Sequence, residues 1–279
     1  MLSYDPKNIL LDSSFLIPDS LWLQILPLLP PLPPKKKSGR PRSDDRLIFT
    51  AISYLLRTGC QWLALPRFFP PKSTVHARFH FWALHGFFLR LWQFALLHYD
   101  SFKGIDWLWQ AIDGSHSLAP LGGQSTGPSF KHHFKPSTTR SLLTDRHGIP
   151  IGLSIDSANT PDMRLASSTL LSIPIPRPIP SPLSPQHLCA DKGYDYPLIH
   201  SLLPSLLYTP HIARKHLPPP SSSLPPPKLP PRRWVVERTH AWMNFSRRII
   251  LRWEKLVSHY LAFAQLSCAF IIFKSAKLL

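Results

Sequence analysis

Residues 111–115 read Ala-Ile-Asp-Gly-Ser, and residues 189–195 read Cys-Ala-Asp-Lys-Gly-Tyr-Asp. Each stretch places an Asp, Asp113 or Asp191, at the end of an apolar run and close to a glycine. A third stretch, residues 232–242, carries Glu237, one of two glutamates in 279 residues. Three carboxylates on separate elements suit an oxygen-ligand site for Mg²⁺ or Mn²⁺. The sequence therefore predicts a divalent-metal site built from three distant segments.

The chain is strongly basic, with 32 Lys and Arg against 15 Asp and Glu and a net charge of +17. Such a surplus favours a polyanionic partner, most often nucleic acid. Arg233 and Arg238 flank Glu237, and Arg247 and Arg248 follow further along the chain. Arginine binds phosphate through paired hydrogen bonds, so we expect these four side chains to contact a nucleic-acid backbone. A solvated basic face remains the alternative for Arg247 and Arg248.

Cysteine content and hydropathy indicate a cytoplasmic protein that does not bind a membrane. The three cysteines are widely spaced, which argues against a disulfide framework or a zinc site. The first residues lack the basic-then-apolar layout of a signal peptide. The apolar run 256–273 is nearly long enough to span a bilayer, but it contains His259 and Gln265, so we expect a buried helix.

Residues 1–100 are predicted to form a small all-α domain. A short helix over 15–30 is followed by a Pro-rich, basic linker over 31–45. In this linker the Gly39–Pro41 core, which contains Arg40 and is followed by Arg42, resembles minor-groove hooks. A simple solvated linker is the alternative reading of these residues.

Two further helices are expected over 46–57 and 73–84, the second with Ser73 as its N-cap. In the second helix an apolar face (Val75, Phe79, Trp82) opposes a polar one formed by His76 and His80, with Arg78 at the border. This pattern indicates a helix-turn-helix-like domain whose recognition helix presents those three polar residues to DNA. A plain helical bundle fits the same pattern.

From residue 105 the pattern changes to alternating strands and helices. The predicted order is a strand over 105–112, a loop over 114–137, a hairpin of 141–145 with 149–155, a helix over 162–171, a strand over 187–190, a helix over 196–203, a strand over 206–212, and closing helices over 232–253 and 256–275. Pro-rich linkers interrupt it at 172–185 and 217–231. This order predicts an α/β, ribonuclease-H-like catalytic domain in residues 101–279.

An ordered set of motifs makes the chain resemble the DDE transposases of bacterial insertion sequences, in the insertion-sequence-five family. The motifs that carry the resemblance are Gly39–Arg42, Leu56–Trp62, Ser73–Val75, Ala119–Gly123, Thr126–Pro128, Arg140–Asp145, Ala158–Asn159 with Asp162, Ala190–Tyr194, Arg232–Asn244 and Arg252–Lys255. The resemblance implies a transposase that binds the terminal inverted repeats of its element. It also implies metal-dependent cleavage and transfer of DNA strands, with two Mg²⁺ or Mn²⁺ ions and a homodimer on double-stranded DNA.

The family's three acidic residues correspond to Asp113, Asp191 and Glu237, which the resemblance makes catalytic and metal-binding. The DNA-binding candidates are Arg40, Arg42, His76, Arg78, His80, Arg140, Arg233, Arg238, Arg247 and Arg248. Four other acids compete with the triad. Asp145 is interpreted as a turn residue, Asp162 and Asp195 as helix caps, and Glu254 as too distant from Glu237 to share its metal pair.

The chain also departs from the family pattern. Residues 137–140 read Ser-Thr-Thr-Arg where the family usually has Gly-Thr-Lys-Arg, and Phe245-Ser246 replace its Arg-Phe. The basic and aromatic segment 130–134 replaces a polar loop. A decayed, catalytically inactive transposase that only binds DNA is therefore the main alternative. A ribonuclease-H-like nuclease without a transfer step, and an interaction protein using its Pro-rich segments, are further rivals.

Overall fold

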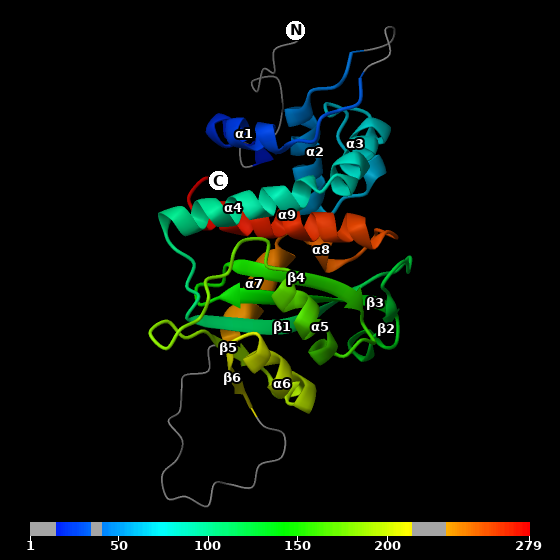
Figure 1. The fold of residues 1–279 in the computed structure, drawn as a ribbon. Coiled ribbons are helices and arrows are strands. Elements are labelled where there is room, and N and C mark those ends of the chain that lie inside the picture. The colour runs from blue at the N-terminus through cyan, green and yellow to red at the C-terminus, as the bar shows by residue number, and fades with distance from the viewer. Residues whose placement is uncertain (1–14, 35–40, 214–232) are drawn as a thin grey trace, which may run out of the picture.

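The computed structural model describes residues 15–34, 41–213 and 233–279, and its centre is a six-stranded mixed sheet (Figure 1). The strands are β1 (Trp109–Leu118), β2 (Gly127–Pro128), β3 (Pro136–Asp145), β4 (Pro150–Ser157), β5 (His187–Ala190) and β6 (Thr209–Ile212). Strand β1 pairs antiparallel with β3 and parallel with β5, β4 pairs with β3, β6 lies beside β5, and β2 pairs with the start of β3. An antiparallel meander extended by parallel strands is the predicted ribonuclease-H-like arrangement.

Helices cover both faces of this sheet (Figure 1). One face carries α5 (Asp162–Leu171) and, beside it, α6 (Pro197–Ser205). The other face carries α7 (Trp234–Asn244), α8 (Arg247–Ile250) and α9 (Val257–Ser275). The parallel pairing of β1 with β5 requires a long crossover, and the β3–β4 hairpin with α5 provides it.

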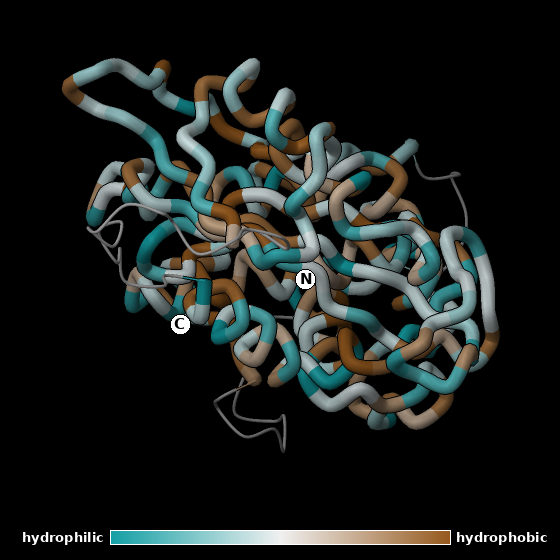
Figure 2. Tube along the Cα trace, turned by 90° about the horizontal axis from the view of Figure 1, so that it is seen from below, coloured by the Kyte–Doolittle hydropathy of each residue, from teal (hydrophilic) through white to brown (hydrophobic). Residues whose placement is uncertain are grey.

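Within residues 15–34 and 41–108, four α-helices precede the sheet: α1 (Asp19–Ile25), α2 (Asp45–Thr58), α3 (Lys72–Leu84) and α4 (Phe87–Phe102). The side chain of Asp44 caps α2 by accepting a hydrogen bond from Leu47 N, and Gly59 ends this helix in the left-handed conformation. Hydrophilic and hydrophobic segments alternate along the helical turns in Figure 2, as expected for helices with one buried face.

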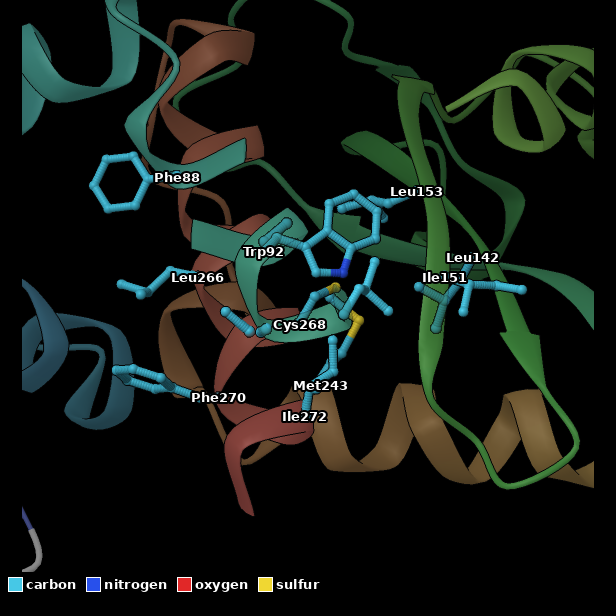
Figure 3. Close-up of a cluster of buried hydrophobic side chains, with 14 of the residues drawn as sticks. Phe88, Trp92, Leu142, Ile151, Leu153, Met243, Leu266, Cys268, Phe270 and Ile272 are labelled. Atoms are coloured by element: carbon cyan, nitrogen blue, oxygen red, sulfur yellow. The ribbon is translucent and has the colours of Figure 1, made fainter. Parts of the chain in front are cut away.

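The hydrophobic core is continuous from these helices into the sheet. Helix α4 lies along α9, and Trp92 of α4 reaches the β3–β4 hairpin (Figure 3). Its indole Nε1 donates a hydrogen bond to Pro150 O at 2.9 Å. In Figure 3, Met243 of α7 and Cys268 of α9 approach the same cluster. The N-terminal helices and the sheet therefore stabilise each other.

Helix α9 satisfies the length and composition of a membrane span, and no other helix in the described ranges does. Two thirds of its apolar window is buried inside the protein, against α4, α7 and β4. The predicted buried helix is confirmed.

Three local predictions are wrong. Strand β1 does not end at residue 112 but runs through Asp113 to Leu118, because β3 pairs with it along that whole length. Residues 232–253 are not one helix: α7 ends at Asn244, α8 is a single turn, and Leu251 is extended and bridges to Leu118. Helix α3 begins one residue before Ser73, with Pro71 at the N-cap.

The two Pro-rich linkers have different outcomes. Residues 172–185 follow the end of α5 and contain neither a helix nor a strand of the sheet, in agreement with the predicted irregular connection. The second predicted linker, 217–231, lies outside the described residues, as does Arg40.

Candidate active site

Asp113 and Asp191 meet where β1 and β5 separate. The parallel pairing of these strands ends at Ala111 and Cys189, and each Asp lies two residues further along the chain, Asp113 within β1 and Asp191 directly after β5. Beyond the last pair the edge of β1 is open, so the two carboxylates face the same gap. Both were predicted for this site, and the sheet brings them together.

The Asp113 side chain lies in a negatively charged environment. Burial, together with the nearby charges of Asp191 and Asp162, raises the pKa of its carboxyl to about 6. The backbone N–H of Gly114, which donates to Asp113 Oδ1 at 2.8 Å, and the Arg233 guanidinium act in the opposite direction. Because an uncompensated carboxylate is costly in a buried position, this cluster favours a bound cation.

Glu237 approaches from α7, on the face of the sheet opposite α5. Arg233 connects it to Asp113: Arg233 Nη1 lies 2.6 Å from Glu237 Oε1 and 3.9 Å from Asp113 Oδ2. The pair Arg233 and Glu237 is spaced four residues apart, so both side chains project from the same side of the first turn of α7. One guanidinium thus holds together two of the predicted metal ligands.

The donor chemistry of these residues fits a hard divalent cation, since all the candidate ligands are carboxylate oxygens. As they stand, no three His, Cys, Asp or Glu side chains within residues 15–34, 41–213 and 233–279 are close enough to hold an ion. The Arg233 guanidinium occupies the position between Asp113 and Glu237. An ion that bridges these carboxylates requires this guanidinium to withdraw.

Asp162 is a fourth carboxylate at the same place, and its predicted role as a helix cap is wrong. The N-cap of α5 is Pro161, and no side chain caps this helix. A Cβ atom built on Gly114 would lie 2.3 Å from Asp162 Oδ1, so the carboxylate rests against the backbone next to Asp113. Burial raises the pKa of Asp162, Lys131 lowers it and Asp191 raises it. In the sequence, the glycine after Asp113 and the place of Asp162 in the motif with Ala158 and Asn159 are the two signals that could have drawn attention to this residue.

The remaining competing acids have structural roles. Asp145, interpreted as a turn residue, accepts hydrogen bonds from the N–H groups of His147 and Ile149 at 2.8 Å and closes the β3–β4 turn. Asp195 is not a helix cap, because its Oδ1 lies 2.7 Å from His200 Nε2 and Tyr196 precedes α6.

His240 links α7 to the backbone of β1. Its Nε2 lies 3.3 Å from Asp113 O, and the side chain is buried. Burial, together with the nearby charge of Arg140, lowers the pKa of His240 to about 3. The imidazole is therefore neutral near pH 7, and its Nε2–H donates to the Asp113 carbonyl. This bond positions the strand that carries Asp113 relative to the helix that carries Glu237.

Three arginines predicted to bind DNA are engaged inside the protein. Arg140 is 1% exposed and donates to Asn244 Oδ1 at 3.1 Å. Arg248 is 3% exposed and forms a 2.7 Å ion pair with Glu254. Arg78, whose side chain is 10% exposed, pairs with Asp45 of α2. The burial of Arg140 and Arg248 corrects those two predicted DNA contacts, because such a guanidinium cannot reach a phosphate without unpacking. Arg78 is only partly buried, and its ion pair with Asp45 competes with a DNA contact.

Other DNA-binding candidates differ in accessibility. Arg247 is exposed, and Arg42 is exposed and donates to Pro33 O. Arg238 stacks between the rings of Trp234 and Trp242, at 4.8 and 4.5 Å from their centroids, and donates to His147 O at 2.7 Å. It therefore braces the β3–β4 turn.

The histidines of the predicted recognition helix face α9. His80 Nδ1 lies 2.8 Å from His259 Nε2, and the His76 ring stands edge-on to Trp62 with centroids 4.8 Å apart. Residues 59–71 connect α2 to α3, far more than the short turn of a helix-turn-helix motif. His76 remains on the exposed surface, whereas His80 is half-buried.

The basic and aromatic segment between β2 and β3 lies beside the carboxylates. The rings of Phe130 and Phe134 are 85% and 63% exposed and contact each other at 4.7 Å. The charge of Lys131 lowers the pKa values of Asp162, His116 and His240, which places this ammonium group next to the site. This departure from the family pattern therefore puts a cation and two solvent-facing rings at the edge of the carboxylate cluster.

Comparison with known proteins agrees with this geometry. Residues 17–92 match the family model described as "Putative transposase of IS4/5 family", and residues 110–272 match the model "Transposase DDE domain". The chain is 30% identical over 158 residues, 56% of its length and 72% of the relative's, to the "Putative transposase for insertion sequence element IS402" of Burkholderia cepacia. It is 35% identical over 132 residues, 45% of its length and 90% of the relative's, to the "Insertion element IS402 uncharacterized 16.2 kDa protein" of the same organism. The chain belongs to the IS4/5 family of DDE transposases.

Proposed function

We propose that this transposase binds the terminal inverted repeats of its insertion sequence and performs metal-dependent cleavage and transfer of DNA strands with Asp113, Asp191 and Glu237. One observation carries the proposal: Asp113 and Asp191 converge where β1 and β5 separate, and Glu237 is tied to Asp113 through Arg233. The DDE domain supports the reaction class, because it matches 110–272 and so includes all three residues.

When bound, two Mg²⁺ or Mn²⁺ ions would activate the attacking oxygen and stabilise the leaving 3′ oxygen of a phosphodiester. Asp113 and Asp191 would hold both ions from the open edge of β1, and Glu237 would add a ligand from α7. The His240 side chain bonds to the backbone carbonyl of Asp113 and so holds β1 in position relative to α7. Since cleavage and transfer are both attacks of an oxygen on a phosphodiester, the same residues serve both steps.

Arg233 has two states in this proposal. Without metal and DNA its guanidinium neutralises Asp113 and Glu237. When cations replace it, the freed guanidinium can bind a phosphate oxygen of the scissile strand. Lys131, beside the carboxylates, would contact the same backbone, and Arg42 and Arg247 would contact duplex DNA further away. The net charge of +17 supports a DNA partner.

The remaining proposals concern organisation. Residues 1–100 would recognise the element ends, residues 101–279 would perform catalysis, and a homodimer would hold two ends together, in the cytoplasm at the nucleoid. Because α4 and α9 share one core, end recognition is best tested with the full chain.

The test is cleavage of a plasmid that carries the element's own ends, with purified full-length protein and Mg²⁺ or Mn²⁺. We expect cuts that expose 3′ hydroxyls with the unmodified protein and none with Glu237→Gln, while both bind the ends. Asp195→Asn is the matched control, since Asp195 pairs with His200 of α6, and it should cleave normally. Cleavage by Glu237→Gln would refute the site.

A decayed, inactive copy remains the second candidate, supported by the replacements over 137–140 and at 245–246. Position 139, where the family usually has Lys, holds a fully buried Thr whose hydroxyl makes no hydrogen bond in the described part of the chain. Binding of the ends without cleavage by the unmodified protein would establish this alternative.

A further inference from the structure

We propose that Asp162 is a fourth metal ligand of this site, which supplies an outer carboxylate from α5 as Glu237 does from α7. This inference rests on the proposed metal-dependent function and extends it. Asp113 and Asp191 would be shared by the two ions, and each ion would receive its own outer ligand from one face of the sheet.

The position of Asp162 is the first argument. Its carboxylate fills the space where residue 114 would carry a side chain: a Cβ there would meet Oδ1, Cγ and Oδ2 of Asp162 at 2.3, 2.6 and 2.9 Å. Gly114 does not have a positive φ, so its backbone conformation does not require glycine. Close approach of the Asp162 carboxylate is therefore the structural reason for glycine beside Asp113.

The second argument is that Asp162 has no visible structural task. It does not cap α5, and within the described residues its carboxylate takes part in no hydrogen bond or ion pair. A carboxylate in the first turn of a helix is stabilised only weakly by the helix dipole. The positive charge of Lys131 also acts on Asp162, but neither effect requires the carboxylate to be buried beside the like charges of Asp113 and Asp191.

An independent group points into the same space. The Tyr194 side chain is 1% exposed, and its hydroxyl has no partner that meets both the distance and the angle of a hydrogen bond in the described part of the chain, while the nearby Ser141 hydroxyl lowers its pKa. Asp162, Asp113 and Asp191 all act on this hydroxyl electrostatically. A buried O–H group without a full hydrogen bond is destabilising, and a ligand atom held among the three carboxylates would give this hydroxyl a partner.

The arrangement of the faces assigns the ion that Asp162 serves. Helix α5 packs on one face of the sheet and α7 on the other, and the open edge of β1 lies between them. Asp162 and Glu237 therefore reach the shared pair Asp113 and Asp191 from opposite sides. Loss of Asp162 should weaken one ion and leave the Glu237 side of the site intact.

In the experiment, the full-length protein is titrated with Mn²⁺, and binding is monitored by calorimetry and by electron paramagnetic resonance. Thermal unfolding is measured separately in the presence of a chelator and in the presence of Mn²⁺. Asp162→Asn should bind the weaker Mn²⁺ at least about tenfold less tightly, or lose it. In chelator this variant should unfold at the same or a higher temperature than the unmodified protein, because a like charge has been removed. Its stabilisation by Mn²⁺ should be smaller.

Gly114→Ala provides a second variant that keeps all four carboxylates. Its methyl group would displace the Asp162 side chain, so it should weaken the same ion. Asp195→Asn is the control and should bind both ions normally. Normal Mn²⁺ binding by Asp162→Asn, alongside weakened binding by Glu237→Gln, would overturn the inference and leave the proposed function standing. An unmodified protein that binds no Mn²⁺ would overturn both.

Discussion

Glu254 and Arg248 offer a quantitative test of which arginines are structural. Arg248 Nε and Nη2 both lie 2.7 Å from Glu254 Oε1, and the two side chains are 3% and 4% exposed. Arg248 Nη1 also donates to Cys60 O at 2.7 Å, which ties α8 to the end of α2. This pair therefore connects the N-terminal helices to the segment that follows α7.

Removing one partner leaves the other charge buried and unpaired, which typically costs about 3–5 kcal/mol. We expect Glu254→Gln and Arg248→Met each to lower the free energy of unfolding by about this amount. At roughly 2–4 °C per kcal/mol for a chain of this size class, the melting temperature should fall by about 6–20 °C. The double variant Arg248→Met/Glu254→Leu should recover much of the loss, because no unpaired charge remains.

Urea unfolding of the two single variants and the double variant gives the coupling energy directly. Binding of the folded variants to DNA at several salt concentrations gives a second readout. Each lost phosphate contact lowers the salt slope by about 0.9, so Arg248→Met should leave that slope unchanged. A stability loss below about 1 kcal/mol for Glu254→Gln, or a reduced salt slope for Arg248→Met, would refute the structural role.

Three further predictions concern pH and the backbone. Burial raises the pKa of Asp145 from 3.8 to about 6. Its protonated form therefore stabilises the folded state at low pH, and this contribution is lost as the pH rises from about 4 through 6. The free energy of unfolding of Asp145→Asn, measured in urea, should vary less with pH over that range. Protons should compete with Mn²⁺ at Asp113, because the pKa of this carboxyl is raised to about 6. The Mn²⁺ affinity measured by calorimetry should therefore be about tenfold weaker at pH 5 than at pH 7. Equal Mn²⁺ affinities at the two pH values would contradict this. Gly148 has φ 87° and a Cβ there would lie 2.8 Å from Thr239 Oγ1, whereas Gly104 has φ 79° and nothing within 4 Å. Both Ala variants should lose about 1–2 kcal/mol through backbone strain, and Gly148→Ala should lose more; equal losses would show that the crowding is unimportant.

Local patterns predicted several elements well. Helix α5 and strand β5 have the predicted bounds, and the hairpin turns at Arg146, His147 and Gly148 as expected. In each case the signal is local: a periodic apolar pattern for α5, a short apolar run for β5, and a glycine with positive φ in the turn.

Long-range pairing explains the local failures. The second half of β1 is rich in small and polar residues, which read as a loop, yet pairing with β3 as far as Leu118 and Ser137 makes it a strand. The predicted helix over 232–253 breaks because Leu251 and Arg252 turn to bond with Leu118. Neither partner can be inferred from the neighbouring sequence.

The sequence by itself determined the family, the three carboxylates of the proposed triad and the α/β class, because motif order and apolar periodicity are properties of the chain. Only the tertiary structure decided which charged groups meet. It buried Arg140 and Arg248 as structural cations, set Arg233 between Asp113 and Glu237, and brought Asp162 against Gly114. The physical reason is that the burial of a side chain and its electrostatic partners depend on contacts between segments that can be more than a hundred residues apart. Helix and strand propensity and apolar periodicity, in contrast, are properties of a single segment.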